Sequence, residues 1–314
     1  MSTVLFTHPD CTRHEMTAGH PERPARIAAI LEQLEKDGLM GSLDVREATP
    51  ASRAHLTRAH GADYVDHVFS VAPQEENAMV QLDGDTSMNS HSLRAALLAA
   101  GAGIEAVDRV LQGECRNAFC CVRPPGHHAE RNQAMGFCFF GSVAVAALHA
   151  LQQDAVNKVA IVDFDVHHGN GTEDLISGRD DIFFCSSFQH PLYPGYFGKN
   201  IDGQKINIPL PAATEGAVFQ EQMRLQCLPA LEAFKPDMIF ISAGFDAHAD
   251  DLLGGLNLLE EDFSWITEQL VQMADRHCDG RIVSMLEGGY DLASLGRSAS
   301  AHVSELLKAA TAAG

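Results

Sequence analysis

The feature that most constrains the fold is residues 159–171, where a buried-looking strand ends in polar chemistry. The segment begins Val-Ala-Ile-Val, a run typical of a strand covered on both faces of a parallel sheet. Asp163, Asp165 and His167 follow directly, and then a Gly-Asn-Gly sequence. Side chains alternate along a strand, so these three would share one face if the extended conformation continued to His167. Two carboxylates and an imidazole on one face suggest a metal site.

Apolar strands and helices alternate along the rest of the chain. Strands are expected at residues 117–123, 181–187, 206–210, 237–243 and 281–286, and helices at 25–36, 63–69, 92–111, 142–152, 172–176, 218–234 and 260–277, with a last helix after these. This order predicts an α/β fold with a mainly parallel central sheet flanked by helices on both faces. The 314 residues contain no Pro-, Gly- or Ser-rich linker, so we expect a single domain over residues 1–314.

Polar groups that are able to do chemistry follow four of the predicted strands. His127 and His128 stand in a rigid Pro-Pro-Gly loop, Asp246 follows a second buried strand, and Tyr290 lies on a Gly-Gly turn. Ligands collect beyond the carboxyl ends of strands in such sheets. We therefore expect these groups to converge with the acidic residues at 163–167.

Asp165, His167 and Asp246 would offer a metal two carboxylates and one imidazole, with positions left open for water and substrate. Three protein ligands with open positions are the arrangement of catalytic zinc sites, and mixed oxygen and nitrogen ligands also suit Fe²⁺, Co²⁺ or Mn²⁺. The alternative is a buried hydrogen-bonded network without a metal. Unpaired buried charge is costly, which favours the metal.

His127 and His128 titrate near neutral pH and could serve as a general base and a general acid. Tyr290 could donate a hydrogen bond to an oxyanion. Together with a metal, these groups predict metal-assisted hydrolysis of a carbonyl compound.

Composition excludes several other classes of protein. Lys and Arg number 22 against 42 Asp and Glu, and the net charge of −20 opposes a nucleic-acid partner. The acidity either favours cationic substrates or keeps the protein soluble. We find no secretory signal and no apolar run of membrane-spanning length, and the eight cysteines form no C-x-x-C pair. These features predict a cytoplasmic protein with reduced core thiols and no membrane partner, and they indicate no particular oligomeric state.

Six motifs occur in an order that resembles the histone deacetylase family. They are His-Pro-Glu-Arg-Pro at 20–24, Arg-Pro-Pro-Gly-His-His-Ala at 123–129, Gly-Phe-Cys at 136–138, Asp-x-Asp-x-His-His-Gly-Asn-Gly at 163–171, Ser-Ala-Gly-Phe-Asp-Ala at 242–247 and Glu-Gly-Gly-Tyr at 287–290. They look most like the class II and bacterial deacetylase-like amidohydrolases, which include acetylpolyamine amidohydrolases. The resemblance implies the arginase/deacetylase fold and the removal of acetyl or other acyl groups from lysine side chains or similar amides.

The resemblance also implies two kinds of metal ion. Zinc, with Fe²⁺ or Co²⁺ as possible substitutes, would be held by Asp165, His167 and Asp246. The family also binds a structural potassium ion, which is expected here at the carbonyls of Asp163, Asp165 and His167 with Ser186 and Ser187 nearby.

For catalysis, the resemblance implies a base and acid pair formed by His127 and His128. Asp163 would be oriented toward the first histidine and Asn170 toward the second, and an asparagine there supports the class II character. Tyr290 would polarise the amide carbonyl.

For the substrate, the resemblance implies a narrow acyl-lysine tunnel with Phe137 and Tyr193 as its walls. Tyr193 replaces a more usual phenylalanine. Leu253 aligns with the position at which polyamine-selective relatives carry an acidic residue, so an apolar side chain favours acyl-lysine or hydrophobic amides. The alternative is an acetylpolyamine substrate, attracted by nearby Asp250 and Asp251.

Two other functions compete with this interpretation. His248 and Asp250, beside Asp246, could complete a binuclear manganese site of a guanidino hydrolase, but such an enzyme would have no use for the histidine pair. A catalytically silent acyl-lysine binding module is the other alternative, and the presence of every expected catalytic side chain disfavours it.

The loop before the first predicted helix carries His20, Glu22 and Arg23. These residues either form a functional loop or a hydrogen-bonded network at the surface. Taken alone, the sequence favours the surface network.

Overall fold

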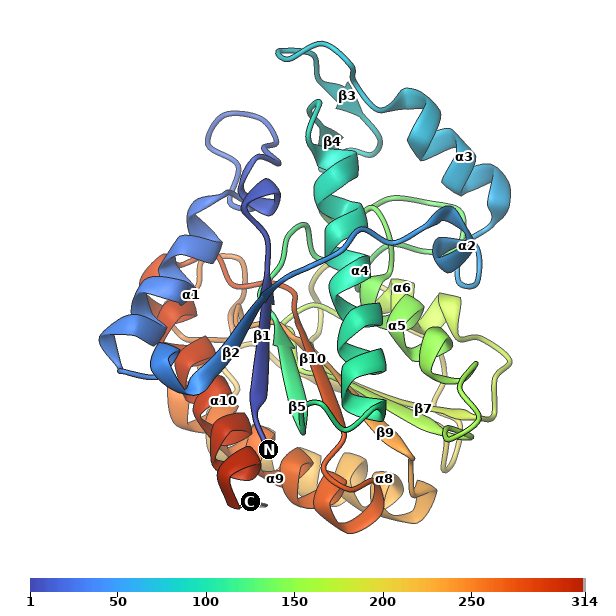
Figure 1. Ribbon diagram of the computed structural model, residues 1–314. Helices are drawn as coiled ribbons and strands as arrows, with labels where there is room; N and C mark the ends of the chain where they lie inside the picture. Colours follow the sequence, from blue (N-terminus) through green and yellow to red (C-terminus); the bar gives the residue numbers. More distant parts are fainter. Residues whose placement is uncertain (313–314) are drawn as a thin grey trace.

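The protein forms an eight-stranded sheet in a computed structural model that describes residues 1–312 (Figure 1). The strands are β1 (Thr3–Thr7), β2 (Leu43–Glu47), β5 (Asn117–Cys120), β6 (Val159–Asp163), β7 (Ile182–Gln189), β8 (Lys205–Leu210), β9 (Met238–Ala243) and β10 (Ile282–Leu286). Their order in the sheet is β2-β1-β5-β10-β9-β6-β7-β8, and every neighbouring pair is parallel. A short antiparallel hairpin, β3 (Val80–Gln81) and β4 (Ser87–Met88), stands apart.

Helices cover both faces of the sheet. They are α1 (Ala25–Lys36), α2 (Arg53–Leu56), α3 (Ala62–Val71), α4 (Ser92–Leu111), α5 (Ser142–Ala150), α6 (Asn170–Leu175), α7 (Gly216–Gln222), α8 (Leu228–Phe234), α9 (Glu260–His277) and α10 (Leu292–Ala312). On one face, α4 and α5 pack against the central strands, and α1, α9 and α10 form the layer on the other (Figure 1). The prediction of a mainly parallel sheet flanked on both faces is confirmed.

The central strands are buried because both of their faces are covered. Every residue of β6, β7, β9 and β10 is buried, which matches the apolar residues that predominate in their sequences. All eight cysteines are free and buried, as the sequence predicted.

The loop after β6 differs from the extended conformation considered above. The strand ends at Asp163, and the next residues bend. The reason is local: the backbone N–H of Asp165 donates to Asp163 Oδ1 at 3.1 Å, and that of His167 donates to Asp165 Oδ1 at 2.9 Å. These side-chain bonds replace the ladder bonds of a strand. A bend, and not strand alternation, therefore gathers the polar residues.

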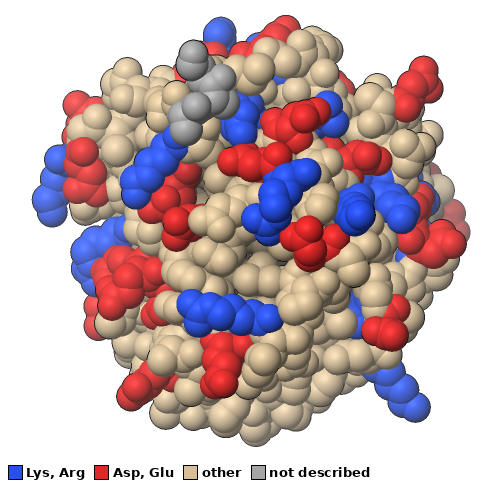
Figure 2. Space-filling view, turned by 90° about the horizontal axis from the view of Figure 1, so that it is seen from below, with Lys and Arg blue, Asp and Glu red and all other residues tan. Residues whose placement is uncertain are grey.

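The carboxyl ends of the parallel strands lie at the end of the molecule that carries β3 and β4, the upper end in Figure 1. The opposite face, seen from below in Figure 2, shows basic and acidic side chains interspersed and no continuous basic area. Within residues 1–312, no helix is both long and apolar enough to cross a membrane.

Candidate functional site

Three predicted ligands meet at the carboxyl end of the sheet. Asp165 and His167 come from the loop after β6, and Asp246 comes from the loop after β9, the strand paired with β6. His167 Nδ1 lies 3.1 Å from Asp165 Oδ1 and 3.2 Å from Asp246 Oδ2. One ligand atom from each residue lies within 4.8 Å of the others, and residues 1–312 contain no other such group of three.

The surroundings of these three side chains fit a bound cation. Asp246 Oδ2 is buried and has no hydrogen-bond partner. Burial and the charge of Asp165 raise the pKa of Asp246 to about 7. Burial opposes charge on His167, but its hydrogen bond to Asp165 and its ion pair with Asp246 outweigh burial and raise its pKa to about 10. The negative charge of these buried carboxylates is not fully compensated by the neighbouring side chains, and a bound divalent cation would compensate it.

Gly288 lies against both aspartates. Its N–H donates to Asp165 Oδ2 at 2.9 Å, and a Cβ atom there would fall 2.1 Å from Asp246 Oδ2. Only glycine allows the chain after β10 to approach the acidic pair so closely.

The two histidines stand side by side at the rim of the same group, with ring centroids 4.0 Å apart. His127 Nδ1 lies 2.9 Å from Asp163 Oδ2, and His128 Nδ1 lies 2.7 Å from Asn170 Oδ1. The structure therefore brings each histidine to the partner expected for it. Glu287, which the sequence analysis did not assign, holds this loop through the N–H groups of Gly126 and His127.

The pKa values of the two imidazole rings are shifted in opposite directions. Burial opposes charge on His127, but the carboxylates of Asp165 and Asp163 outweigh burial and raise its pKa well above the usual range. Burial and the neighbouring His127 lower the pKa of His128 well below it. The charge of Asp165 is the largest factor that raises the pKa of His127, so a divalent cation held by Asp165 would offset that charge and favour the neutral ring, which can accept a proton.

A cavity of about 220 Å³ opens above these residues. It is lined by Asp85, His128, Gly136, Phe137, His167, Leu192, Tyr193, Leu253 and Tyr290. The residues predicted for the tunnel thus line one cavity together with His128 and Tyr290, two of the three predicted catalytic residues. The ring of Phe137 meets Tyr290 edge-on at 5.8 Å, and that of Tyr193 meets His128 edge-on at 5.0 Å.

Asp85 is a cavity residue that the sequence analysis missed. It lies on the β3–β4 turn, where its Oδ1 accepts from the N–H of Gly136, and neighbouring Thr86 Oγ1 accepts from the N–H of Phe137. The Asp-Gly-Asp-Thr sequence at 83–86 marks a turn, but its distance along the chain from the histidines gave no sign of this contact.

The network predicted at the surface around Glu22 is wrong, because the side chain is fully buried. Its carboxylate accepts from Arg26 on α1 and from Arg123 before the histidine loop. Two guanidinium groups allow a carboxylate to be buried, since charge-assisted hydrogen bonds offset desolvation. Arg26 in turn donates to the carbonyls of Gly289 and Glu287, and so touches the turn that carries Tyr290.

The remaining predicted residues lie near or outside the group. Ser187 Oγ donates to the carbonyl of Asp163 at 3.5 Å, and Ser186 Oγ lies 3.1 Å from the ring of His168. His248 and Asp250 are not part of the metal-ligand group found within residues 1–312.

A parallel sheet that gathers an Asp-His-Asp group, a histidine pair and a tyrosine around one cavity defines a hydrolytic enzyme. The chain belongs to the histone deacetylase family, because the histone deacetylase domain matches residues 20–306. The resemblance found in the sequence is confirmed, and with it hydrolytic deacetylase activity.

Relatives support the same assignment. The chain is 39% identical over 281 residues to the histone deacetylase-like amidohydrolase of Pseudomonas aeruginosa, covering 87% of this chain and 73% of that protein. It is 38% identical to the chloroplastic histone deacetylase 10 of Oryza sativa subsp. japonica, covering 94% and 71%. The crystal structure of the HDA15 HD domain superposes with a TM-score of 0.89 at 34% identity, over 98% of this chain and 88% of that one.

Proposed function

We propose that this protein is a zinc-dependent amidohydrolase that removes acetyl groups from lysine side chains or similar amides. The observation that carries the proposal is the position of the Asp165, His167 and Asp246 group below a cavity that His128 and Tyr290 also line. Fe²⁺ and Co²⁺ suit the same ligands.

Asp165, His167 and Asp246 would hold the ion. A bound zinc ion supplies Lewis acidity, which polarises a carbonyl and lowers the pKa of a coordinated water. The chain's own groups then handle the protons.

His127 takes the proton of the attacking water, because Asp163 binds its Nδ1 and leaves Nε2 on the side of the metal group. His128 gives a proton to the leaving amine, with Asn170 bound to its other nitrogen. Tyr290 donates a hydrogen bond to the carbonyl oxygen as negative charge develops there.

Elemental analysis by inductively coupled plasma tests the metal. We expect about one equivalent of zinc, iron or cobalt in the purified protein and its loss in Asp246→Asn. Purified active protein without any of these metals would refute the assignment.

A structural potassium ion is the second ion that we propose. The supporting contact is that of Ser187 with the carbonyl of Asp163, the last residue of β6, directly before the loop that carries Asp165 and His167. Activity and thermal stability should both be higher in potassium chloride than in an equal concentration of a tetraalkylammonium salt.

An acyl-lysine substrate fits the cavity better than a free polyamine. Leu253 is apolar, and the acidic residues near it are already engaged: Asp251 accepts from the N–H groups of Tyr290 and Asp291, and Asp250 pairs with Arg297. Asp85, on the β3–β4 turn, is the carboxylate that lines the cavity together with Leu253, and the acids beside Leu253 in the sequence are held by other partners, so they are not positioned to bind a second ammonium group.

The experiment compares kcat/KM on an acetyl-lysine peptide with that on acetylputrescine. We expect the wild-type enzyme to prefer the peptide and Leu253→Glu to shift the ratio toward acetylputrescine by about fivefold, since one charge pair contributes on the order of 1 kcal/mol. Leu252→Glu, at a neighbouring residue that is 94% exposed, is the matched control. A large wild-type preference for the polyamine, or activity on arginine or agmatine alone, would refute the proposed substrate.

A further inference from the structure

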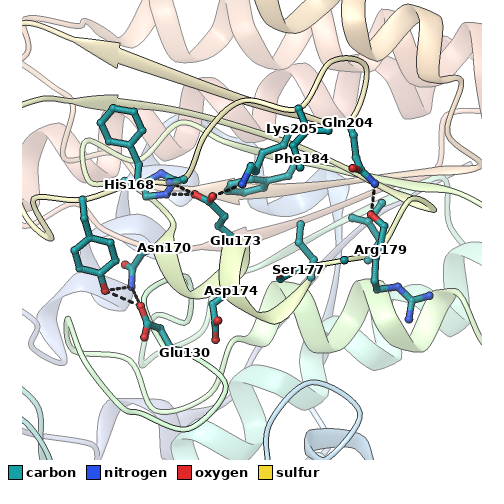
Figure 3. A pocket seen from close by; sticks show the side chains of 17 residues that line it. Glu130, His168, Asn170, Glu173, Asp174, Ser177, Arg179, Phe184, Gln204 and Lys205 are labelled. Atoms are coloured by element: carbon teal, nitrogen blue, oxygen red, sulfur yellow. Dashed lines mark hydrogen bonds and ion pairs between the residues drawn. The ribbon is translucent and has the colours of Figure 1, made fainter.

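Asn170 connects His128 to a carboxylate that lies outside the catalytic cavity. Its Oδ1 lies 2.7 Å from His128 Nδ1, and its Nδ2 donates to Glu130 Oε1 at 2.8 Å. The hydroxyl of Tyr196 donates to the same Glu130 oxygen at 2.6 Å. Figure 3 shows Glu130 and Asn170 facing each other at one end of a second cavity of about 280 Å³.

The chemistry of these groups permits only one arrangement. A side-chain amide keeps its shape when it is rotated by 180°, so its neighbours decide which end is oxygen. An ionised carboxylate only accepts hydrogen bonds, so Glu130 requires the NH₂ end of Asn170. The carbonyl end is then left to His128, and Nδ1 of His128 must carry a hydrogen to pair with it. Asn170 and His128 are both buried, so water does not relax this requirement.

We propose that Glu130 is a positioning residue for the deacetylase reaction, which fixes the amide orientation of Asn170 and thereby the Nδ1–H tautomer of His128. The inference rests on the proposed role of His128 as proton donor. With Nδ1 committed to Asn170, the ring gains and loses its other proton at Nε2.

Glu130 acts through Asn170 and not on the substrate. It lines the second cavity, together with Asn170 and Tyr196, and is absent from the lining of the catalytic cavity. Its loss should therefore change kcat and leave KM nearly unchanged.

The first test uses the metal-loaded enzyme and an acetyl-lysine peptide. We expect Glu130→Leu to lower kcat about tenfold or more, as is typical for partners that orient a ligand or catalytic group, with KM within about threefold. Glu130→Gln should recover most of the loss, because its carbonyl can accept from Asn170. Glu232→Leu removes a surface carboxylate on α8 that binds Arg276 and His277, and serves as the control. Equal kcat for Glu130→Leu and Glu232→Leu would overturn the proposal.

The second test asks whether the two residues act as a pair. Asn170→Asp places two carboxylates at hydrogen-bond distance, which cannot both be ionised without strong repulsion. Adding Glu130→Gln supplies a donor to the introduced aspartate, so the double variant should be more active than Asn170→Asp alone. A purely structural role predicts losses that add, and additive losses would overturn the proposal.

A third measurement does not depend on activity. In zinc-loaded protein with ¹⁵N-labelled histidine, the His128 signals are those lost in His128→Gln. We expect an Nδ1–H tautomer in the wild type and an Nε2–H tautomer or a mixture in Glu130→Leu. An unchanged tautomer would overturn the inference, whereas a changed tautomer in a protein without deacetylase activity would uphold it and refute the proposed function.

Discussion

Tyr290 is held in place by contacts that do not involve its hydroxyl group. Its backbone N–H donates to Asp251 Oδ2 at 2.6 Å, and its ring meets Phe137 edge-on. The guanidinium of Arg26 lies 4.8 Å from the ring centroid. Burial raises the pKa of its hydroxyl well above the usual range, so at neutral pH it stays a hydrogen-bond donor. The backbone and ring can thus keep their position when the hydroxyl is removed.

Tyr290→Phe should therefore lower kcat by about 10²–10³-fold, the range for loss of one oxyanion donor, and change KM little. Steady-state kinetics on an acetyl-lysine peptide measure this. Tyr64→Phe is the control, because that hydroxyl donates to the carbonyl of Phe139 in a buried structural contact. It should cost about 1 kcal/mol of unfolding free energy and leave kcat intact. A similar fall in kcat for both variants would contradict the oxyanion role.

At the scale of elements, helix α1 and the turn after β10 are joined by buried charge. Arg26 on α1 donates to the carbonyls of Gly289 and Glu287, and Glu22 forms ion pairs with both Arg26 and Arg123. Gly289 has a φ of 117°, a conformation that other residues rarely adopt. The position of the turn therefore depends on a helix almost the whole chain length away.

Arg26→Met should weaken both stability and catalysis. It leaves two carbonyls unpaired and removes one of the two guanidinium partners of Glu22, so we expect a loss of about 3–5 kcal/mol in unfolding free energy. Because the turn carries Tyr290, kcat should also fall at temperatures at which the variant is still folded. Urea unfolding and kinetics on the same samples measure the two effects. The control Arg297→Met breaks exposed pairs with Glu260 and Asp250, which contribute about 0–1 kcal/mol. Equal unfolding midpoints for the two variants would contradict this account.

The elements differ in how far the sequence could predict them. The helices at 92–111 and 260–277 begin and end where their apolar periodicity indicated. The strands β1 and β2 were missed; β2 is an edge strand with the sequence Leu-Asp-Val-Arg-Glu and only its first residue is buried, so it has no apolar run. The single helix expected at 218–234 is α7 and α8 joined by a π-helical turn.

Within the site, the sequence motifs identified the predicted catalytic residues but not the residues that position them. The structure places His127 and His128 at the partners that the sequence analysis expected. The resemblance to the histone deacetylase family supplied those partners but implied no role for Glu130 or Glu287, whose contacts join residues 40 and 161 positions apart. Only the folded sheet brings such partners together.

At the scale of the whole molecule, the site gathers several buried carboxyl groups in a protein whose overall charge is already strongly negative. Burial and the charge of Asp165 raise the pKa of Asp246, and burial raises the pKa of Glu287 to about 7 although His127 opposes the shift. When no cation is bound, these carboxyls keep their protons to a higher pH in the folded protein than in the unfolded chain. Folding and metal binding then respond to pH in opposite directions.

Removal of the metal should therefore destabilise the protein more at high pH than at low pH. Raised carboxyl pKa values in the folded state contribute stability below the unfolded values, near pH 4, and this stability is lost as the pH rises to about 7. Metal binding requires deprotonated ligands, so it strengthens over the same range. A free metal concentration of a hundred times Kd stabilises by about 2.7 kcal/mol, which corresponds to a Tm difference of about 4 °C.

Thermal unfolding of metal-loaded and chelator-treated protein measures this difference. We expect it to grow between about pH 4 and about pH 7, the window set by the raised pKa of Asp246 and Glu287. Asp246→Asn, which carries no charge at any pH, should show little response to the chelator and a flatter dependence of Tm on pH without metal. If the Tm difference stays constant or shrinks as the pH rises, protons on these carboxyls do not compete with metal binding, and the prediction is wrong.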